Sequence, residues 1–411
     1  MKWTVNRILV LIISLGILGA GIIQAVSRYR NEDSLPVFDK TNYTIGVLSA
    51  DNHTMPNYHA IVDIALEDIN QYLSENDIKC NISFDVKSTQ RDPQTNLMTI
   101  RDWDLSGVRL FIGPPFSFMM ATTMSYAHDN DVVVLESIST FPNFALDDNS
   151  FRLSVPYDKE GEILAEILNQ RGYDTAICIE SEDFVTWTAD EFERNFNGET
   201  NRVKYDPDDV NSTVHLSKAD ELIGIYSDNH VAVVFFSYRN LSHLINQSTK
   251  YNRLSSVSWL TQNQGSSLEG ILEKVGSTGD QLNITTYNLD IPESDTYQRI
   301  KSQYQKMTDE ELDLKMLYVY DSCWLYTHAI LETGTDNATI IKTALPLVAS
   351  EYGGVCGVIE FDKYGDRDKA QYMVYTLFTE NGKVFTKENE KITIKLKEIT
   401  RESADQWKKS R

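Results

Sequence analysis

Apolar residues along the chain follow two alternating patterns, short unbroken runs and longer segments with helical spacing. YTIGVLS (43–49) is an unbroken run, and in HAIVDIALEDINQYL (59–73) apolar residues recur every three or four positions. Unbroken runs are typical of parallel strands covered on both faces, and the second pattern is typical of amphipathic helices. The alternation therefore predicts an α/β fold in which helices cover both faces of parallel sheets.

The same alternation appears as two successive series. The first series predicts strands at 43–49, 82–86, 108–112 and 131–137, with helices at 59–73, 96–103 and 117–128. The second predicts strands at 174–180, 230–237, 256–261 and 284–289, with helices at 159–172, 185–197, 241–250 and 267–275. Two long apolar helices, 316–334 and 338–353, are expected after the last of these strands.

The chain then changes to a pattern of β-hairpins. VIEF (358–361) and QYMVYTL (371–377) alternate like half-buried strands on either side of DKYGD (362–366). Asp, Gly and Lys between two such runs indicate a turn, so a hairpin is expected here.

Length and net charge limit the number of lobes and the kinds of partner that are expected. At 411 residues the chain is long for a single core, and two lobes are expected. The net charge of −22, from 38 Lys and Arg against 60 Asp and Glu, disfavours nucleic acid as a partner.

The N-terminus contains nineteen residues without a charge, ILVLIISLGILGAGIIQAV (8–26), flanked by Lys and Arg. This length suits either a removed signal peptide or a permanent membrane anchor within residues 1–30. Residues 31–40 read as a linker. The rest of the chain is expected outside the cytoplasm, in the periplasm or at the cell surface.

Four cysteines, Cys80, Cys178, Cys323 and Cys356, leave the redox state open. In an exported chain they can form up to two disulfides, with three alternative pairings. Cys178 lies in an apolar strand and also fits a buried free thiol.

Several short segments together resemble a known family. They are TIGVLS, IALEDIN, STQRDP, FIGPPFS, ESISTFPN, FRLSVP, YVYDSCWLYTHAI and GVCGVIEFDKYGDR, spread between Thr44 and Leu377. The chain resembles the substrate-binding proteins of branched-chain amino-acid (Leu/Ile/Val) ABC transporters, whose type I periplasmic-binding fold is shared with receptor ligand-binding regions.

The resemblance implies two doubly wound lobes with a ligand cleft between them and three crossings of the chain, near Pro156, Tyr287 and Gly353. It places residues 41–155 plus 288–352 in lobe one, residues 156–287 plus 353–400 in lobe two, and a tail at 401–411. In open α/β sheets ligands lie outside the carboxyl ends of the strands, so the cleft is expected between the two sets of strand ends.

Lobe one contributes two candidate ligand-binding loops. Phe116 and Ser117 follow a strand and open a helix, where backbone N–H groups and the serine hydroxyl suit an anion such as an α-carboxylate. In the second loop the resemblance implies Thr140, with backbone contacts from Ile138 and Ser139. The alternatives are a helix-capping serine and a turn-capping threonine.

Lobe two contributes weaker candidates, Phe184, Tyr238 and Asn263, and Tyr320 is a further aromatic candidate of lobe one. Core packing is the alternative for the aromatic residues. Asn263, beside Gln262, stands where the family places a carboxylate for the ligand ammonium. An amide cannot neutralise that charge unless another carboxylate, such as Glu136, turns inward.

No catalytic or cofactor motif is found, and the seven histidines show no metal spacing. A calcium site at Asp362, Asp366 and Asp368 is less favoured than a turn, since the spacing lacks the alternating ligands and distal Glu of a calcium loop. A serine hydrolase built on Ser117 lacks the tight Gly-flanked turn that such a nucleophile needs.

The sequence thus predicts a non-enzymatic, extracytoplasmic solute-binding protein without cofactor. It would capture a small polar ligand, an amino acid or similar compound, and deliver it to an ABC permease. The alternative is a ligand-sensing ectodomain of the same fold that reports to a membrane signalling protein.

Overall fold

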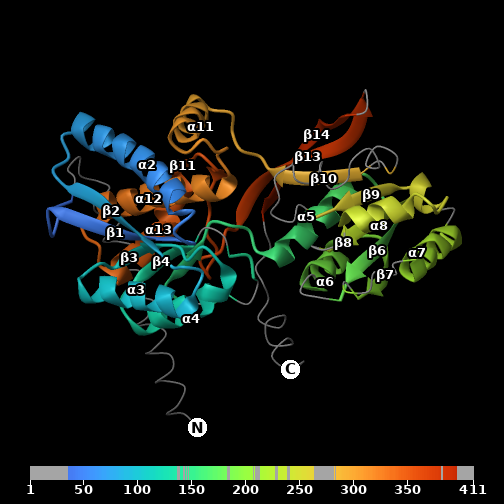
Figure 1. Cartoon of the computed structure of the whole chain (residues 1–411), viewed down its shortest axis with the longest axis horizontal. Coiled ribbons are helices and arrows are strands. Elements are labelled where there is room, and N and C mark those ends of the chain that lie inside the picture. Colours follow the sequence, from blue (N-terminus) through green and yellow to red (C-terminus); the bar gives the residue numbers. More distant parts are fainter. Residues whose placement is uncertain are drawn as a thin grey trace, which may run out of the picture.

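The computed structural model describes residues 36–136, 139–141, 144, 146, 148–182, 186–206, 208, 213–226, 230–237, 241–262, 282, 284–380 and 383–395. Two sheets divide these residues into two lobes, which lie side by side (Figure 1).

Lobe one consists of the elements on and around the first sheet. They are β1 (Asn42–Ser49), α2 (Met55–Glu75), β2 (Asn81–Ser88), α3 (Pro93–Leu105), β3 (Leu110–Ile112), α4 (Ser117–Asp129), β4 (Val133–Glu136), β5 (Ser150–Arg152), α11 (Asp295–Thr308), α12 (Leu314–Thr333), α13 (Ala338–Glu351), β11 (Gly353–Gly354) and β12 (Gly357–Val358).

Lobe two consists of the elements on the second sheet. They are α5 (Tyr157–Gln170), β6 (Thr175–Ser181), α6 (Thr186–Asn195), β7 (Glu199–Tyr205), α7 (Thr213–Ile225), β8 (Val231–Phe236), α8 (Leu241–Ser248), the short 3-10 helix η2 (Leu254–Ser256), β9 (Ser258–Thr261), β10 (Ile284–Leu289), β13 (Lys369–Glu380) and β14 (Lys383–Lys395).

Both sheets have the doubly wound order. The first runs β2-β1-β3-β4-β5 and is parallel throughout. The second runs β14-β13-β10-β9-β8-β6-β7, in which β13 and β14 are antiparallel additions to a parallel sheet. The fold class predicted from the sequence is confirmed.

Successive strand residues point into different cores. On β1, Ile45 and Val47 belong to a cluster that includes α2 and α12, whereas Leu48 belongs to the cluster on the side of α3 and α4. Figure 1 shows these helix groups on opposite faces of the first sheet. The two-residue period of a strand explains why the strands are apolar without interruption.

Helix α12 is the central helix of lobe one. It is apolar on all sides, and most of its residues are buried between α2, α13 and the sheet. Its buried Asp321 accepts hydrogen bonds from the backbone N–H groups of Val355 and Cys356, both at 2.9 Å, and from the Tyr352 hydroxyl at 2.8 Å. The segment after α13 is therefore held on lobe one.

The chain crosses between the lobes three times, and a buried ion pair fixes the last of these passages. The Arg152 guanidinium, at the end of β5, donates from Nε and Nη2 to the two Asp366 oxygens, each at 2.5 Å. Both side chains are buried. The neighbouring Arg367 donates to the carbonyl oxygens of Leu153 and Cys356. This double attachment joins the first passage between the lobes to the third.

Strand membership places the three passages. The chain leaves the first sheet after β5 and enters α5, returns from β10 to α11, and enters β13 at Lys369. Tyr287 lies inside β10, and Gly353 lies in a short strand pair on lobe one. The residue limits expected for the two lobes stay a prediction.

The hairpin predicted between VIEF and QYMVYTL is wrong. Its second strand exists as part of β13, but it pairs with β10 and β14. On the VIEF side Val358 pairs with Gly353, and Phe361 forms an isolated bridge to Arg367 at the base of the turn. Ile359 and Phe361 alternate with polar residues because they pack against lobe one, Phe361 on Phe151 at 5.2 Å between ring centroids.

The turn at 362–366 is confirmed. The Asp362 carboxylate accepts the backbone N–H groups of Tyr364 and Asp366, and the Asp362 N–H donates to the Asp366 carbonyl. Asp366 is engaged by Arg152, so these carboxylates serve the turn. Among the described residues no group of three or more His, Cys, Asp or Glu side chains could hold a metal ion.

Some elements escaped the sequence patterns because little of them is buried. In α11 only Ile300 and Tyr304 are buried, and in the edge strand β7 only Val203 and Tyr205. Helix α7 was also not predicted. In contrast, α3 begins earlier than expected because Asp92 caps the Thr95 N–H.

All four cysteines are buried free thiols. Of the two alternatives left open by the sequence, the structure has the unpaired one. Burial raises the pKa of the thiols at Cys80, Cys178, Cys323 and Cys356, which makes their reactive thiolate forms scarce at neutral pH.

Asp366→Asn is expected to lower the free energy of unfolding by about 3 kcal/mol, because it leaves the buried Arg152 guanidinium without a counter-charge. Urea unfolding measures this. The matched control is Asp63→Asn on the exposed side of α2, which should change stability by less than about 0.5 kcal/mol. Equal effects of the two variants would contradict the structural role of the ion pair.

Candidate ligand-binding site

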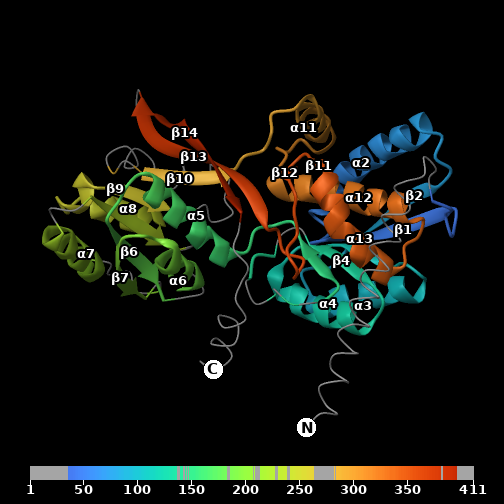
Figure 2. The same cartoon turned by 180° about the vertical axis from the view of Figure 1, so that it is seen from behind.

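The candidate site lies where the carboxyl ends of the strands of the two lobes meet the first passage of the chain. The loop after β3 and the loop after β4 come from lobe one, and the first turn of α5 and the end of β9 come from lobe two. In both views α5 begins at the junction of the lobes (Figures 1 and 2). Strand ends of this kind are where α/β proteins bind ligands.

The loop after β3 depends on Gly113. Its φ of +108° lies outside the range of ordinary L-residues, and a Cβ there would come within 2.9 Å of the Leu48 Cβ. The loop leads to Phe116, which is the N-cap of α4, and Ser117 is the first residue of the helix. The Phe116 ring stacks on Phe118, with ring centroids 5.4 Å apart.

Ser117 and Ser139 come together. The Ser139 hydroxyl donates to the Ser117 oxygen at 3.0 Å. Because Phe116 is the N-cap, Ser117 is not the capping residue, and its hydroxyl faces the second loop instead. Ser139 is itself fixed, since its carbonyl accepts the Ser154 hydroxyl at 2.7 Å and its N–H donates to Glu136 at 2.5 Å. Glu136 is thus engaged beneath the loop.

The second loop continues directly onto lobe two. The Thr140 carbonyl accepts the Tyr157 N–H at 2.7 Å. The Phe141 ring meets the edges of Tyr157 and Trp187, at 6.5 and 6.0 Å between centroids. These three aromatic rings form one wall across the junction between the lobes.

Lobe two adds a polar group beside this aromatic wall. The Gln262 amide, after β9, donates to Glu160 at 3.0 Å and to the Thr188 hydroxyl oxygen at 3.4 Å. The Thr188 hydroxyl in turn donates to the Tyr157 carbonyl at 3.0 Å. Hydrogen bonds therefore run from the Thr140 loop of lobe one to the Glu160 carboxylate of lobe two.

Glu160 has a perturbed carboxyl group. Burial raises its pKa to about 7, while hydrogen bonds from Gln262 and Tyr287 oppose that rise. A carboxyl group with such a pKa gains by meeting a cation. The sequence pattern did not single out Glu160, since a glutamate in an amphipathic helix resembles any solvent-facing residue.

The other predicted site residues either lie away from the strand ends or fall outside the described part of the chain. Tyr320 lies between helices, where its hydroxyl donates to Asp68 on α2 at 2.7 Å, and it is not brought to the strand ends. Four candidates, Ile138, Phe184, Tyr238 and Asn263, lie outside the described residues.

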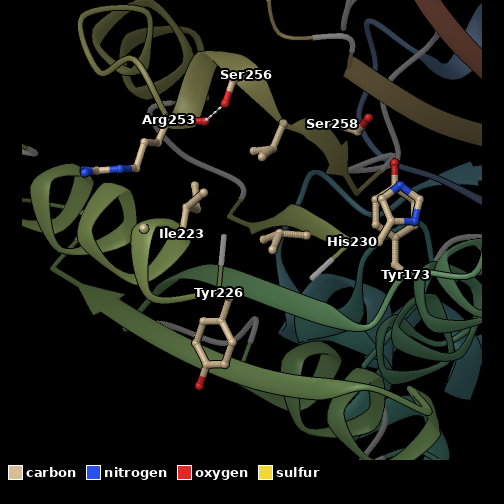
Figure 3. Close-up of a pocket in the computed structure, with 10 residues that line it drawn as sticks. Tyr173, Ile223, Tyr226, His230, Arg253, Ser256 and Ser258 are labelled. Atoms are coloured by element: carbon tan, nitrogen blue, oxygen red, sulfur yellow. Dashed lines mark hydrogen bonds between the residues drawn. The ribbon is translucent and has the colours of Figure 1, made fainter. Parts of the chain in front are cut away.

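A separate hollow of about 600 Å³ lies on lobe two (Figure 3). It is lined by Tyr173, His230 and Ser258, which precede or begin β6, β8 and β9. The Tyr173 and His230 rings stack at 3.8 Å, and Arg253 nearby pairs with Asp220. The hollow is at the amino ends of the strands, opposite the edge that carries Gln262.

None of the helices in the described part of the chain combines the length and apolar character needed to cross a membrane. The apolar segment 8–26 lies outside the described residues, so its role as signal peptide or anchor stays a prediction.

Comparison with known proteins gives a family match that covers most of the chain. Residues 59–379 match the model of a family described as the receptor family ligand binding region. An uncharacterised protein of Methanocaldococcus jannaschii is 23% identical over 350 residues, which cover 78% of this chain and 82% of that protein.

Solved structures with similar folds include substrate-binding proteins of transporters. LivJ of Streptococcus pneumoniae, in complex with isoleucine, has a TM-score of 0.59 at 17% identity, over 86% of this chain and 99% of that one. A leucine-binding protein, LivK of Thermotoga maritima, gives 0.60 at 15% identity, with 86% and 99% coverage. A solute-binding protein of R. palustris, in complex with benzoate, gives 0.56 at 14% identity, with 84% and 96% coverage.

The fold is thus that of the two-lobed type I periplasmic-binding proteins, and the resemblance seen in the sequence is confirmed. The chain belongs to the receptor family ligand binding region. LivJ, LivK and the R. palustris protein are all named as binding proteins, not as enzymes.

Glu160→Gln is expected to stabilise the ligand-free protein more at pH 8 than at pH 5. The raised pKa means that the folded state keeps a proton which the unfolded chain has lost, so wild-type stability falls as pH rises from about 4.5 through about 7. Glutamine cannot ionise and keeps an oxygen for Gln262. Urea unfolding at both pH values should show a difference on the order of 1 kcal/mol.

Glu166→Gln is the matched control, since Glu166 lies on the same helix and its carboxylate accepts the Gln170 amide at the exposed surface. It should show no such pH dependence. The same pH dependence in both variants would contradict the burial of Glu160.

Proposed function

We propose that the protein is an extracytoplasmic solute-binding protein, which holds a small amino acid or amino-acid-like compound between its lobes and delivers it to an ABC permease. The observation that carries the proposal is the continuous polar connection across the junction, from the paired Ser117 and Ser139 hydroxyls through Thr140 and Tyr157 to Glu160. Residues of both lobes meet there.

The lobe-one side suits a carboxylate. Ser117 is at the N-terminus of α4, where free backbone N–H groups and the helix dipole favour an anion. The Ser117 and Ser139 hydroxyls can rotate to donate to a ligand oxygen in place of their mutual hydrogen bond. The aromatic wall of Phe141, Tyr157 and Trp187 offers an apolar surface to the rest of the ligand.

Two lobes joined by passages of the chain can close on a ligand that lies between them. A ligand that contacts both lobes stabilises the closed arrangement over the open one, by its differential affinity for the two. The passages of the chain are the natural hinges, and the ion pair between Arg152 and Asp366 holds two of them together.

A receptor role is the second candidate, because the matched family is described as a receptor ligand binding region. In that case the same closure would be reported to a membrane signalling protein. Both roles require the same ligand site, and they differ in the partner that recognises the closed form.

Addition of a bound amino acid is expected to raise the unfolding midpoint of the protein. A ligand at about a hundred times its Kd adds roughly 2.7 kcal/mol to the free energy of unfolding. Thermal unfolding against a panel of aliphatic and aromatic amino acids, amides, benzoate and sugars measures this. A response to sugars alone, or to none of these compounds, would contradict the proposed ligand class.

Ser117→Ala is expected to weaken binding of the compound that responds best by about tenfold, because one donor to the ligand carboxylate is lost. Isothermal titration measures the Kd. Ser350→Ala, on the exposed surface of α13, is the control and should bind as wild type. Unchanged binding by the Ser117 variant would remove Ser117 from the site.

A further inference from the structure

An amino-acid ligand brings two opposite charges into the site. The paired serines of lobe one suit its carboxylate, but its ammonium group also needs a partner, because burying an unpaired charge is costly. A carboxylate close to the junction of the lobes is the strongest such partner.

Two carboxylates near the junction are already committed to other groups. Glu136 is fully buried under the second loop and accepts the Ser139 N–H at 2.5 Å. Glu162, on α5, forms a buried ion pair with Lys159 at 2.9 Å. Neither can turn to a ligand without leaving its partner unsatisfied.

Glu160 differs from both. It is half-buried, and within the described part of the chain it forms no ion pair with Lys, Arg or His. It lies three residues after Tyr157 on the first turn of α5, so the two residues share one side of the helix. Since the Tyr157 N–H is bonded to Thr140, Glu160 lies beside the contact between the lobes.

We propose that Glu160 selects ligands that carry an ammonium group, by pairing its carboxylate with that group while Ser117 and Ser139 hold the ligand carboxylate. This inference rests on the proposed solute-binding function and adds to it the residue that distinguishes an amino acid from a simple organic acid.

The surroundings of Glu160 support this role. The Gln262 amide fixes one carboxylate oxygen through its hydrogen bond at 3.0 Å, which orients the group. The Phe141, Tyr157 and Trp187 rings add surfaces that attract cations. Burial also holds the pKa of Glu160 near 7, and an adjacent ammonium would favour the ionised form.

The test compares two ligands on two variants by isothermal titration at pH 8. The ligands are L-leucine and isocaproate, which has the same carbon skeleton without the amino group. Glu160→Gln should weaken L-leucine binding by about 30-fold, the scale of one charged hydrogen bond, and leave isocaproate binding within about twofold of wild type. Glu166→Gln, on the same helix, should bind both ligands as wild type does.

The possible outcomes distinguish failure of the proposed role of Glu160 from failure of the proposed binding function. If wild type binds L-leucine and Glu160→Gln binds it equally well, the role of Glu160 is overturned and the binding function stands. An equal loss of both ligands in Glu160→Gln would mean a structural role and also overturn the inference. If wild type binds neither ligand nor any other amino acid, the proposed ligand class itself fails. Thermal unfolding of ligand-free Glu160→Gln, expected at least at the wild-type midpoint, excludes misfolding as the cause of a loss.

Discussion

The arrangement of the two lobes depends on the buried ion pair between Arg152 and Asp366. Arg152 ends the last strand of the first sheet, immediately before the chain passes to α5, and Asp366 lies immediately before it passes to β13. Two charges removed from water need each other and a full set of hydrogen bonds. The Arg152 guanidinium also donates to the Phe141 carbonyl, so the same group supports the loop that carries Thr140.

The ion pair also determines how the candidate site is assembled, because it fixes the first passage of the chain between the lobes. With the first passage fixed, the Tyr157 N–H meets the Thr140 carbonyl and the first turn of α5 faces the ends of the lobe-one strands. Polar groups of both lobes then lie next to an aromatic wall, an arrangement suited to a small amphipathic molecule. The hollow beside Tyr173 and His230 lies at the opposite edge of the second sheet and has no part in this arrangement.

The sequence predicted the alternation of strands and helices, since buried parallel strands and amphipathic helices have distinct periods. The segments that resemble the family also pointed to Ser117, Ser139 and Thr140, which lie in loops after strands, where such folds bind ligands. The sequence could not predict that VIEF packs on lobe one instead of pairing with QYMVYTL, since packing and pairing give the same alternation. It missed Glu160, whose environment is made by residues about a hundred positions away, Gln262 above all.

The proposed function requires that one ligand touches both lobes at their junction. Hydrogen–deuterium exchange of the backbone, with and without saturating L-leucine, tests it directly. Exchange is expected to slow on ligand addition in two separate segments, residues 116–119 of lobe one and 157–161 of lobe two. Protection of only one of these segments, or protection confined to other parts of the protein, would contradict it.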